Sequence, residues 1–124
     1  MTVKELYSKI GNYDDAISRL MNDKLISKFV MKFLTDPSYD LLIKAWEEQD
    51  EKGIFTASHT MKGVCANLSL TDLFSIASSI TEAYRPGNEA LKADFPAEQA
   101  FENLKKEYAR VTACIVEYSE QKEI

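Results

Sequence analysis

The residues best suited to chemistry lie in one short stretch, SHTMKGVCANLSL, from Ser58 to Leu70. This stretch contains His59, the only histidine among 124 residues, followed by Lys62 and Gly63 at spacings of three and four. Imidazole can act as a nucleophile, a general base or a metal ligand. An ammonium group nearby would neutralise an anion carried on the imidazole, such as a phosphoryl group. Glycine costs a helix roughly 1 kcal/mol relative to alanine, so Gly63 needs a reason.

Helical spacing predicts where these side chains point. At about 100° per residue, one side of the helix collects a core stripe, and His59 lies roughly 160° from its centre, so it should face solvent. The stripe consists of Ile54, Ala57, Ser58, Met61, Val64, Cys65 and Leu68. Gly63 and Ala66 share the face of His59, Phe55 lies one turn before it, and Lys62 flanks it. A partner protein could therefore approach the imidazole over a bare surface, with Phe55 as an apolar contact.

The rest of the chain predicts the helices that must position this stretch. Apolar pairs spaced by four predict a first helix after Asn22. A shorter helix follows Pro37, with Leu41, Leu42, Ala45 and Trp46 pointing inward, and the helix that contains His59 begins near Gly53. The segment from Ser69 to Asp72 is typical of a cap that begins a fourth helix. Residues 85–95 are predicted to form a loop with one helical turn, and Pro96 begins a long final helix. The inward face of that last helix is Phe101, Leu104, Tyr108, Val111, Ile115 and Tyr118. These features predict an all-α, antiparallel four-helix bundle with additional short helices. Residues 1–124 form one domain in this interpretation, with an N-terminal helical segment over 1–20 and the bundle over 22–120.

Composition narrows the classes of function. Twenty acidic and fifteen basic residues give a net charge of −5, which argues against nucleic acid as a partner. No apolar run approaches the roughly 20 residues of a membrane span, and the N-terminal stretch is interrupted by charge, unlike a signal peptide. Cys65 and Cys114 lack metal-site spacing, so we expect reduced core residues, no bound metal and a cytoplasmic protein. The absence of a glycine-rich nucleotide loop argues against kinase activity by this chain alone.

At His59, the segment HTMKGVCANLSL resembles the signature of histidine-containing phosphotransfer (HPt) domains, in which a histidine is followed by xxKG within a helix of a four-helix bundle. The following helix, the preceding short acidic helix and the length of the chain agree with it. The resemblance implies a phosphorelay carrier in two-component signalling. His59 would accept a phosphoryl group from the phospho-aspartate of a receiver domain and pass it to another receiver. Lys62 would orient and neutralise the phosphate, and Gly63 would leave room for the receiver.

The resemblance also implies the partners and a lack of intrinsic cofactors. Response-regulator receiver domains and a hybrid histidine kinase would be the partners, the receiver would supply Mg²⁺, and the chain would act as a monomer. This sequence departs from the family pattern at Ser69, where glycine is frequent, and at Thr81, near which many members have an amide or carboxylate. Ser69 could serve as a helix cap instead, and the Thr81 difference places in doubt a hydrogen bond to the imidazole. Arg85, one turn further on, could reach an acidic pocket of the partner.

Two alternatives remain from the residues alone. The first is a non-catalytic helical adaptor that binds a signalling partner through the His59 face. The second is an enzyme that uses His59 as a general base, which would require a concave site and an orienting carboxylate. A helix face offers no evident cleft, and Ser58 should point into the core, so we disfavour the enzyme.

Overall fold

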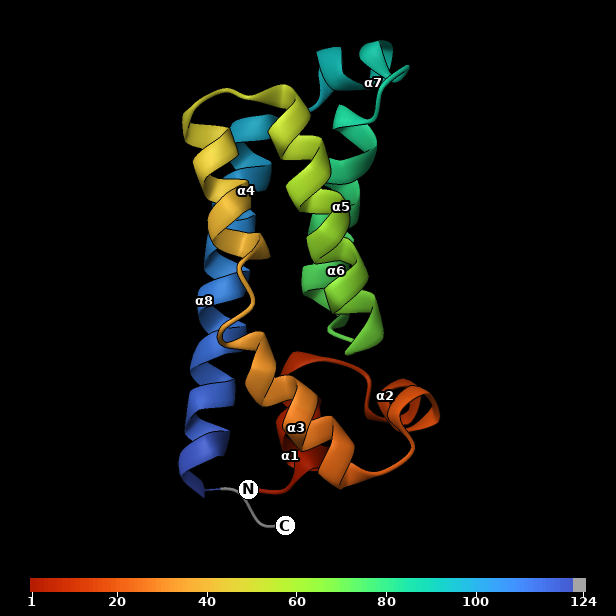
Figure 1. Cartoon of the computed structure of the whole chain (residues 1–124), viewed down its shortest axis with the longest axis vertical. Helices are drawn as coiled ribbons and strands as arrows, with labels where there is room; N and C mark the ends of the chain where they lie inside the picture. Colours follow the sequence, from red (N-terminus) through yellow and green to blue (C-terminus); the bar gives the residue numbers. More distant parts are fainter. Residues whose placement is uncertain (122–124) are drawn as a thin grey trace.

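The computed structural model describes residues 1–121, and helices are the regular secondary structure of this part of the chain. The helices, shown in Figure 1, are α1 Val3–Ile10, α2 Tyr13–Leu20, α3 Asp23–Phe33, α4 Ser38–Glu47, α5 Glu51–Asn67, α6 Thr71–Tyr84, α7 Glu89–Asp94 and α8 Ala97–Gln121. The predicted all-α class is confirmed. No helix among these residues combines the length and the apolar composition needed to span a membrane.

Helices α4, α5, α6 and α8 form the predicted four-helix bundle (Figure 1). Helix α5 packs against both α4 and α6, and α6 packs in turn against α8. The Trp46 and Phe101 rings stack with their centroids 4.2 Å apart and join α4 to α8. The core between these helices is apolar and closed to solvent, and it includes Leu42, Ile54, Met61, Leu73, Ile80 and Leu104. Its burial is the main stabilising term for the bundle.

The long helix α8 extends past the bundle and contacts α1 and α3 (Figure 1). Five of the six predicted inward residues of α8 are buried, and Tyr108 is half-buried. The Tyr108 ring stacks on Tyr39 with centroids 3.6 Å apart. Further along α8, the Tyr118 hydroxyl donates to Ser27 Oγ of α3 at 2.9 Å. The same face of α8 therefore serves the bundle and the N-terminal helices.

The junction between α1 and α2 contacts the turn between α5 and α6. The Tyr7 hydroxyl donates to the Leu68 carbonyl at 2.8 Å, and the Asn12 amide donates to the Ser69 carbonyl at 3.0 Å. A Cβ at Gly11 would come within 2.1 Å of the Ser69 carbonyl oxygen. Glycine is therefore required at position 11 by this close approach of two backbones.

The helix boundaries lie within a few residues of the predicted ones. Asn22 caps α3 by accepting from the Leu25 amide at 2.9 Å, as expected. Helix α5 begins slightly earlier than predicted because Asp50 caps it by accepting from the Gly53 amide at 3.0 Å. The interval between Arg85 and Phe95 contains the six-residue helix α7.

Two predictions of local structure are wrong. Leu41 is 56% exposed, because the buried side of α4 is centred on Ser38, Leu42 and Ala45 instead. Ser69 does not cap α6: the N-cap residue is Leu70, and no side chain makes a cap hydrogen bond there. Ser69 has a positive φ of 56°, and its hydroxyl donates to Asp15 Oδ2 of α2 at 2.5 Å. The left-handed backbone explains why glycine would suit this turn.

Candidate functional site

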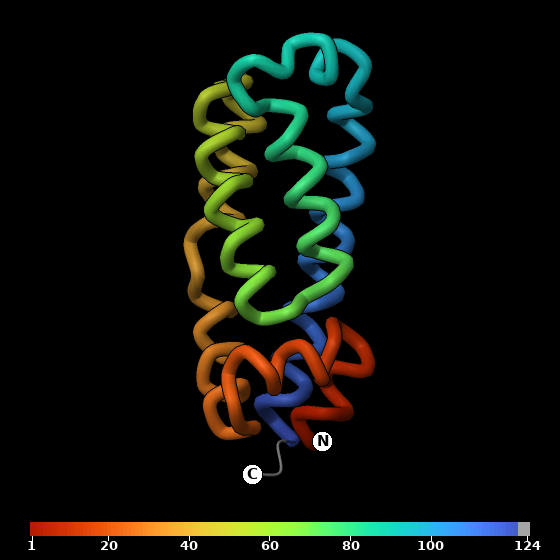
Figure 2. The backbone as a smooth tube through the Cα atoms, turned by 90° about the vertical axis from the view of Figure 1, so that its right-hand side faces the viewer, coloured from red at the N-terminus to blue at the C-terminus, as the bar shows by residue number. Residues whose placement is uncertain are grey.

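His59 lies in the middle of α5 with an exposed side chain, as its position on the helix predicts. The residue before it, Ser58, is fully buried, and its hydroxyl donates to the Phe55 carbonyl at 3.1 Å. Helices α5 and α6 run side by side on the near face in Figure 2, and no other segment crosses in front of them. The His59 side chain is therefore open to solvent.

Gly63 is exposed one turn after His59, and no heavy atom of the surrounding chain lies within 4 Å of a Cβ added there. A mid-helix glycine can reflect close helix packing. That explanation fails at Gly63, where a side chain would enter open space. Ala66, half-buried, continues the strip of small residues toward the end of α5. The fold does not require glycine at position 63, which leaves access to the imidazole as its physical consequence.

Phe55 packs beside the imidazole, and Arg85 packs beside Phe55. The Phe55 and His59 rings are nearly parallel, at 16°, with centroids 5.7 Å apart. The Arg85 Cζ lies 5.2 Å from the Phe55 centroid, within the range of a cation–π contact. These contacts bring together three of the predicted site residues, from α5 and from the end of α6. Lys62 is half-buried on the flank of the same face.

Thr81 and Glu82 of α6 have separate roles. Thr81 is fully buried, and its hydroxyl donates to the Ala77 carbonyl at 2.7 Å within α6. Glu82 is half-buried and accepts from Arg85 Nε at 2.9 Å. This bond, together with the nearby positive charges of Arg85 and Lys62, holds the pKa of the Glu82 carboxyl below its ordinary value. The Glu82 carboxylate is therefore ionised at neutral pH, and its negative charge interacts with the charged groups around the histidine site.

Sequence reasoning did not select Glu82 as a site residue. Its signal would have been its place in α6 beside the buried Thr81, combined with the packing of α6 along α5. Periodicity alone does not fix which helix lies across from that side of α6.

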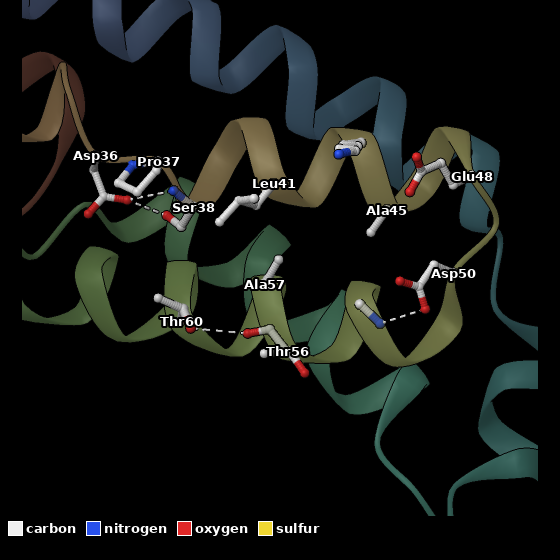
Figure 3. A pocket seen from close by; sticks show the side chains of 12 residues that line it. Asp36, Pro37, Ser38, Leu41, Ala45, Glu48, Asp50, Thr56, Ala57 and Thr60 are labelled. Atoms are coloured by element: carbon white, nitrogen blue, oxygen red, sulfur yellow. Dashed lines mark hydrogen bonds between the residues drawn. The ribbon is translucent and has the colours of Figure 1, made fainter.

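A groove of about 410 Å³ lies on the other side of α5, between α5 and α4 (Figure 3). Apolar side chains in its lining include Leu41, Ala45 and Ala57. Some of its polar groups make local hydrogen bonds: Thr60 donates to the Thr56 carbonyl at 3.1 Å, and Asp50 accepts from the Gly53 amide at 3.0 Å. His59 does not line this groove, so the groove does not supply the cleft that a histidine general base would need.

The charged groups around the groove and the histidine do not form a metal centre. Residues 1–121 contain no group of three or more histidine, cysteine, aspartate and glutamate residues arranged to hold a metal ion. Cys65 is buried, and burial raises the pKa of its thiol to about 12, so it remains a protonated core residue. The face of α5 with the exposed imidazole of His59 also includes Lys62, one turn further along the helix.

The protein is thus an all-α bundle with its single histidine exposed on one helix. The Hpt domain family model matches residues 36–114, more than half of the chain, including α4, α5 and α6. The chain belongs to the Hpt domain family. A search of curated proteins gave no match, and neither did a search of solved structures. Family membership supports a role as a phosphotransfer carrier in two-component signalling, with receiver domains and histidine kinases as the classes of partner.

Proposed function

We propose that His59 is the phospho-acceptor of a phosphorelay. It accepts a phosphoryl group from the phospho-aspartate of one receiver domain and passes it to another. The observation that carries this proposal is the exposed imidazole beside Gly63, where the surrounding chain leaves open space. Membership in the Hpt domain family supplies the class of chemistry.

The transfer step requires little of this chain beyond positioning and charge. The lone pair of one imidazole nitrogen attacks phosphorus while the other nitrogen keeps its hydrogen. The bond from phosphorus to the aspartate oxygen breaks, and its electron pair remains on the aspartate carboxylate. Phosphoryl transfer of this kind depends on in-line alignment and neutralisation of the phosphoryl oxygens. Lys62 supplies a positive charge from this chain, and the receiver supplies its own Mg²⁺.

The partner would dock over the histidine face. Gly63 and Ala66 let its surface approach α5 closely, Phe55 adds apolar contact area, and Arg85 lies at the edge of the contact. We further propose that a hybrid histidine kinase feeds the relay, that this chain has no kinase activity of its own, and that it acts as a cytoplasmic monomer.

A labelling experiment tests this function. The protein is mixed with phosphorylated receiver domains, and transferred label is tested for stability in base and lability in acid, as expected for phosphohistidine. His59→Gln should abolish the label while leaving the fold unchanged by circular dichroism. Thr60→Gln, the adjacent exposed position, is the matched control and should still accept label.

The same variant separates the carrier from the adaptor. If the protein were an adaptor that binds its partner through the His59 face without carrying phosphate, the His59→Gln variant would still bind the partner and signal normally. Label that persists in His59→Gln, or its absence from the wild-type protein with every cognate receiver, contradicts the proposed function.

A further inference from the structure

The histidine site contains an anion that the transfer step does not use. The Glu82 carboxylate accepts from Arg85 Nε at 2.9 Å, and Arg85 lies 5.2 Å from the ring of Phe55, which is nearly parallel to the imidazole of His59. Lys62 is close enough for its positive charge to contribute to the lowered pKa of the Glu82 carboxyl. A phosphoryl group on His59 would add negative charge to the same cluster of side chains, which Arg85 and Phe55 connect to this carboxylate. An acceptor site selected only to hold phosphate tightly would not place a carboxylate there.

A carrier has to release the phosphoryl group as well as accept it. Each cation near the phosphorylated imidazole stabilises that state relative to the phospho-aspartate of either receiver. Too much stabilisation would retain the group on His59 and slow the onward step. A carboxylate at Glu82 would act against this in two ways, because its bond restrains the guanidinium of Arg85 and its negative charge offsets the positive charge of Lys62.

We propose that Glu82 tunes the phosphoryl-transfer equilibrium of His59, keeping the phosphorylated histidine a donor as well as an acceptor. Glu82 is thus a positioning and charge-balancing residue that acts through Arg85 and Lys62. The proposal rests on the proposed function of His59 as phospho-acceptor.

The experiment measures where the phosphoryl group resides at equilibrium. The protein is phosphorylated directly with phosphoramidate, freed of this donor and mixed with an unphosphorylated receiver domain and Mg²⁺. In Glu82→Gln, the ratio of phosphohistidine to phospho-aspartate should rise about two- to fivefold, which is the change in an equilibrium constant expected from losing the interaction of one exposed charge pair. Onward transfer should slow accordingly. Arg85→Gln should shift the ratio in the opposite direction.

Two controls separate charge from structure. Glu82→Asp keeps the charge and should stay near the wild-type ratio, and the effect of Glu82→Gln should shrink at about 1 M salt, where such charges are screened. Glu102 is the matched control because it forms an ion pair of the same spacing with Lys105, at 3.9 Å, on the more distant α8. Glu102→Gln should leave the ratio unchanged.

An unchanged ratio in Glu82→Gln, or a shift toward the receiver, would overturn the proposal. Failure of the proposed function would look different, because phosphoramidate would label His59 while no receiver exchanged label with it. The lifetime of the phosphohistidine would still test Glu82 in that case, with a longer half-life expected in Glu82→Gln. An equal or shorter half-life would contradict its role.

Discussion

At the scale of single residues, the neighbours of His59 along α5 act by different physical means. Lys62 contributes charge, Phe55 contributes a flat surface parallel to the imidazole, and Gly63 contributes the absence of a side chain. The first two can be replaced by residues of similar character, whereas the third cannot. Any substitution at Gly63 adds atoms between α5 and an approaching partner.

Gly63 therefore offers a test in which activity and stability move in opposite directions. Gly63→Gln should slow phosphoryl transfer at least about tenfold, because the partner can no longer align its phospho-aspartate with the imidazole. The free energy of unfolding should stay the same or rise, because glutamine is a better helix residue than glycine. Stopped-flow transfer assays and urea unfolding measure the two quantities.

Ala113→Gln provides the comparison, since Ala113 is an exposed small residue of α8 away from the histidine face. It should leave the transfer rate unchanged. Normal transfer by Gly63→Gln would contradict the argument from access.

At the scale of elements, the turn between α5 and α6 is held in place by α2. Ser69 occupies the left-handed region with φ 56° and donates its hydroxyl hydrogen to Asp15 Oδ2. This bond from Ser69 and a second from Arg19 Nε, at 2.9 Å, lower the pKa of the Asp15 carboxyl. The turn thus combines backbone strain with a bond between residues 54 positions apart in the sequence.

Substitutions at Ser69 separate these two effects. Ser69→Ala should destabilise the protein, because it loses the bond to Asp15 and keeps the strained backbone. Ser69→Gly loses the same bond but relieves the strain, so it should be about 1 kcal/mol more stable than Ser69→Ala. Urea unfolding measures both differences, and equal stabilities of the two variants would show that the backbone is unstrained.

The Ser69 bond also has a predicted pH dependence. Because the pKa of Asp15 is lowered in the folded protein, its stabilising contribution is complete above the ordinary value of 3.8 and is lost as the pH falls through the lowered value. The stability difference between wild type and Ser69→Ala should therefore narrow only below a pH of about 3.8. A difference that narrows near neutral pH would implicate another group.

Much of this arrangement is predictable from the sequence, and the exceptions share a cause. Helical periodicity is local, so it correctly predicts the outward His59 and the buried Ser58. The contact of Ser69 with Asp15 and the place of Glu82 beside the histidine depend on how separate helices pack. Leu41 shows the same limit, because its exposure depends on the rotation of α4 about its own axis. Spacing within one helix contains no information on that rotation.

At the scale of the whole molecule, the N-terminal helices are bonded both to α8 and to the turn between α5 and α6. Arg110 Nη1 donates to the Lys9 carbonyl at 2.7 Å, and Lys9 pairs with Glu117 at 3.7 Å, which joins α1 to α8. Tyr7, Asn12 and Gly11 meet the α5–α6 turn on the other side. The Hpt family match begins at residue 36, after these helices. We propose that α1 and α2 nonetheless form one cooperative domain with the bundle.

Two glycine substitutions of identical chemistry test this proposal. Gly11→Ala places a methyl group against the Ser69 carbonyl oxygen and should destabilise the protein by about 3 kcal/mol or more, since two backbones must move apart. In Gly63→Ala the added methyl group lies in open space on a helix, so this substitution should stabilise the protein by about 1 kcal/mol. If α1 and α2 were an independent appendage, Gly11→Ala would leave the unfolding of the bundle unchanged or produce a separate early transition. A single transition at a lower urea midpoint, monitored both by circular dichroism and by the fluorescence of Trp46 in α4, is the result expected of one cooperative domain.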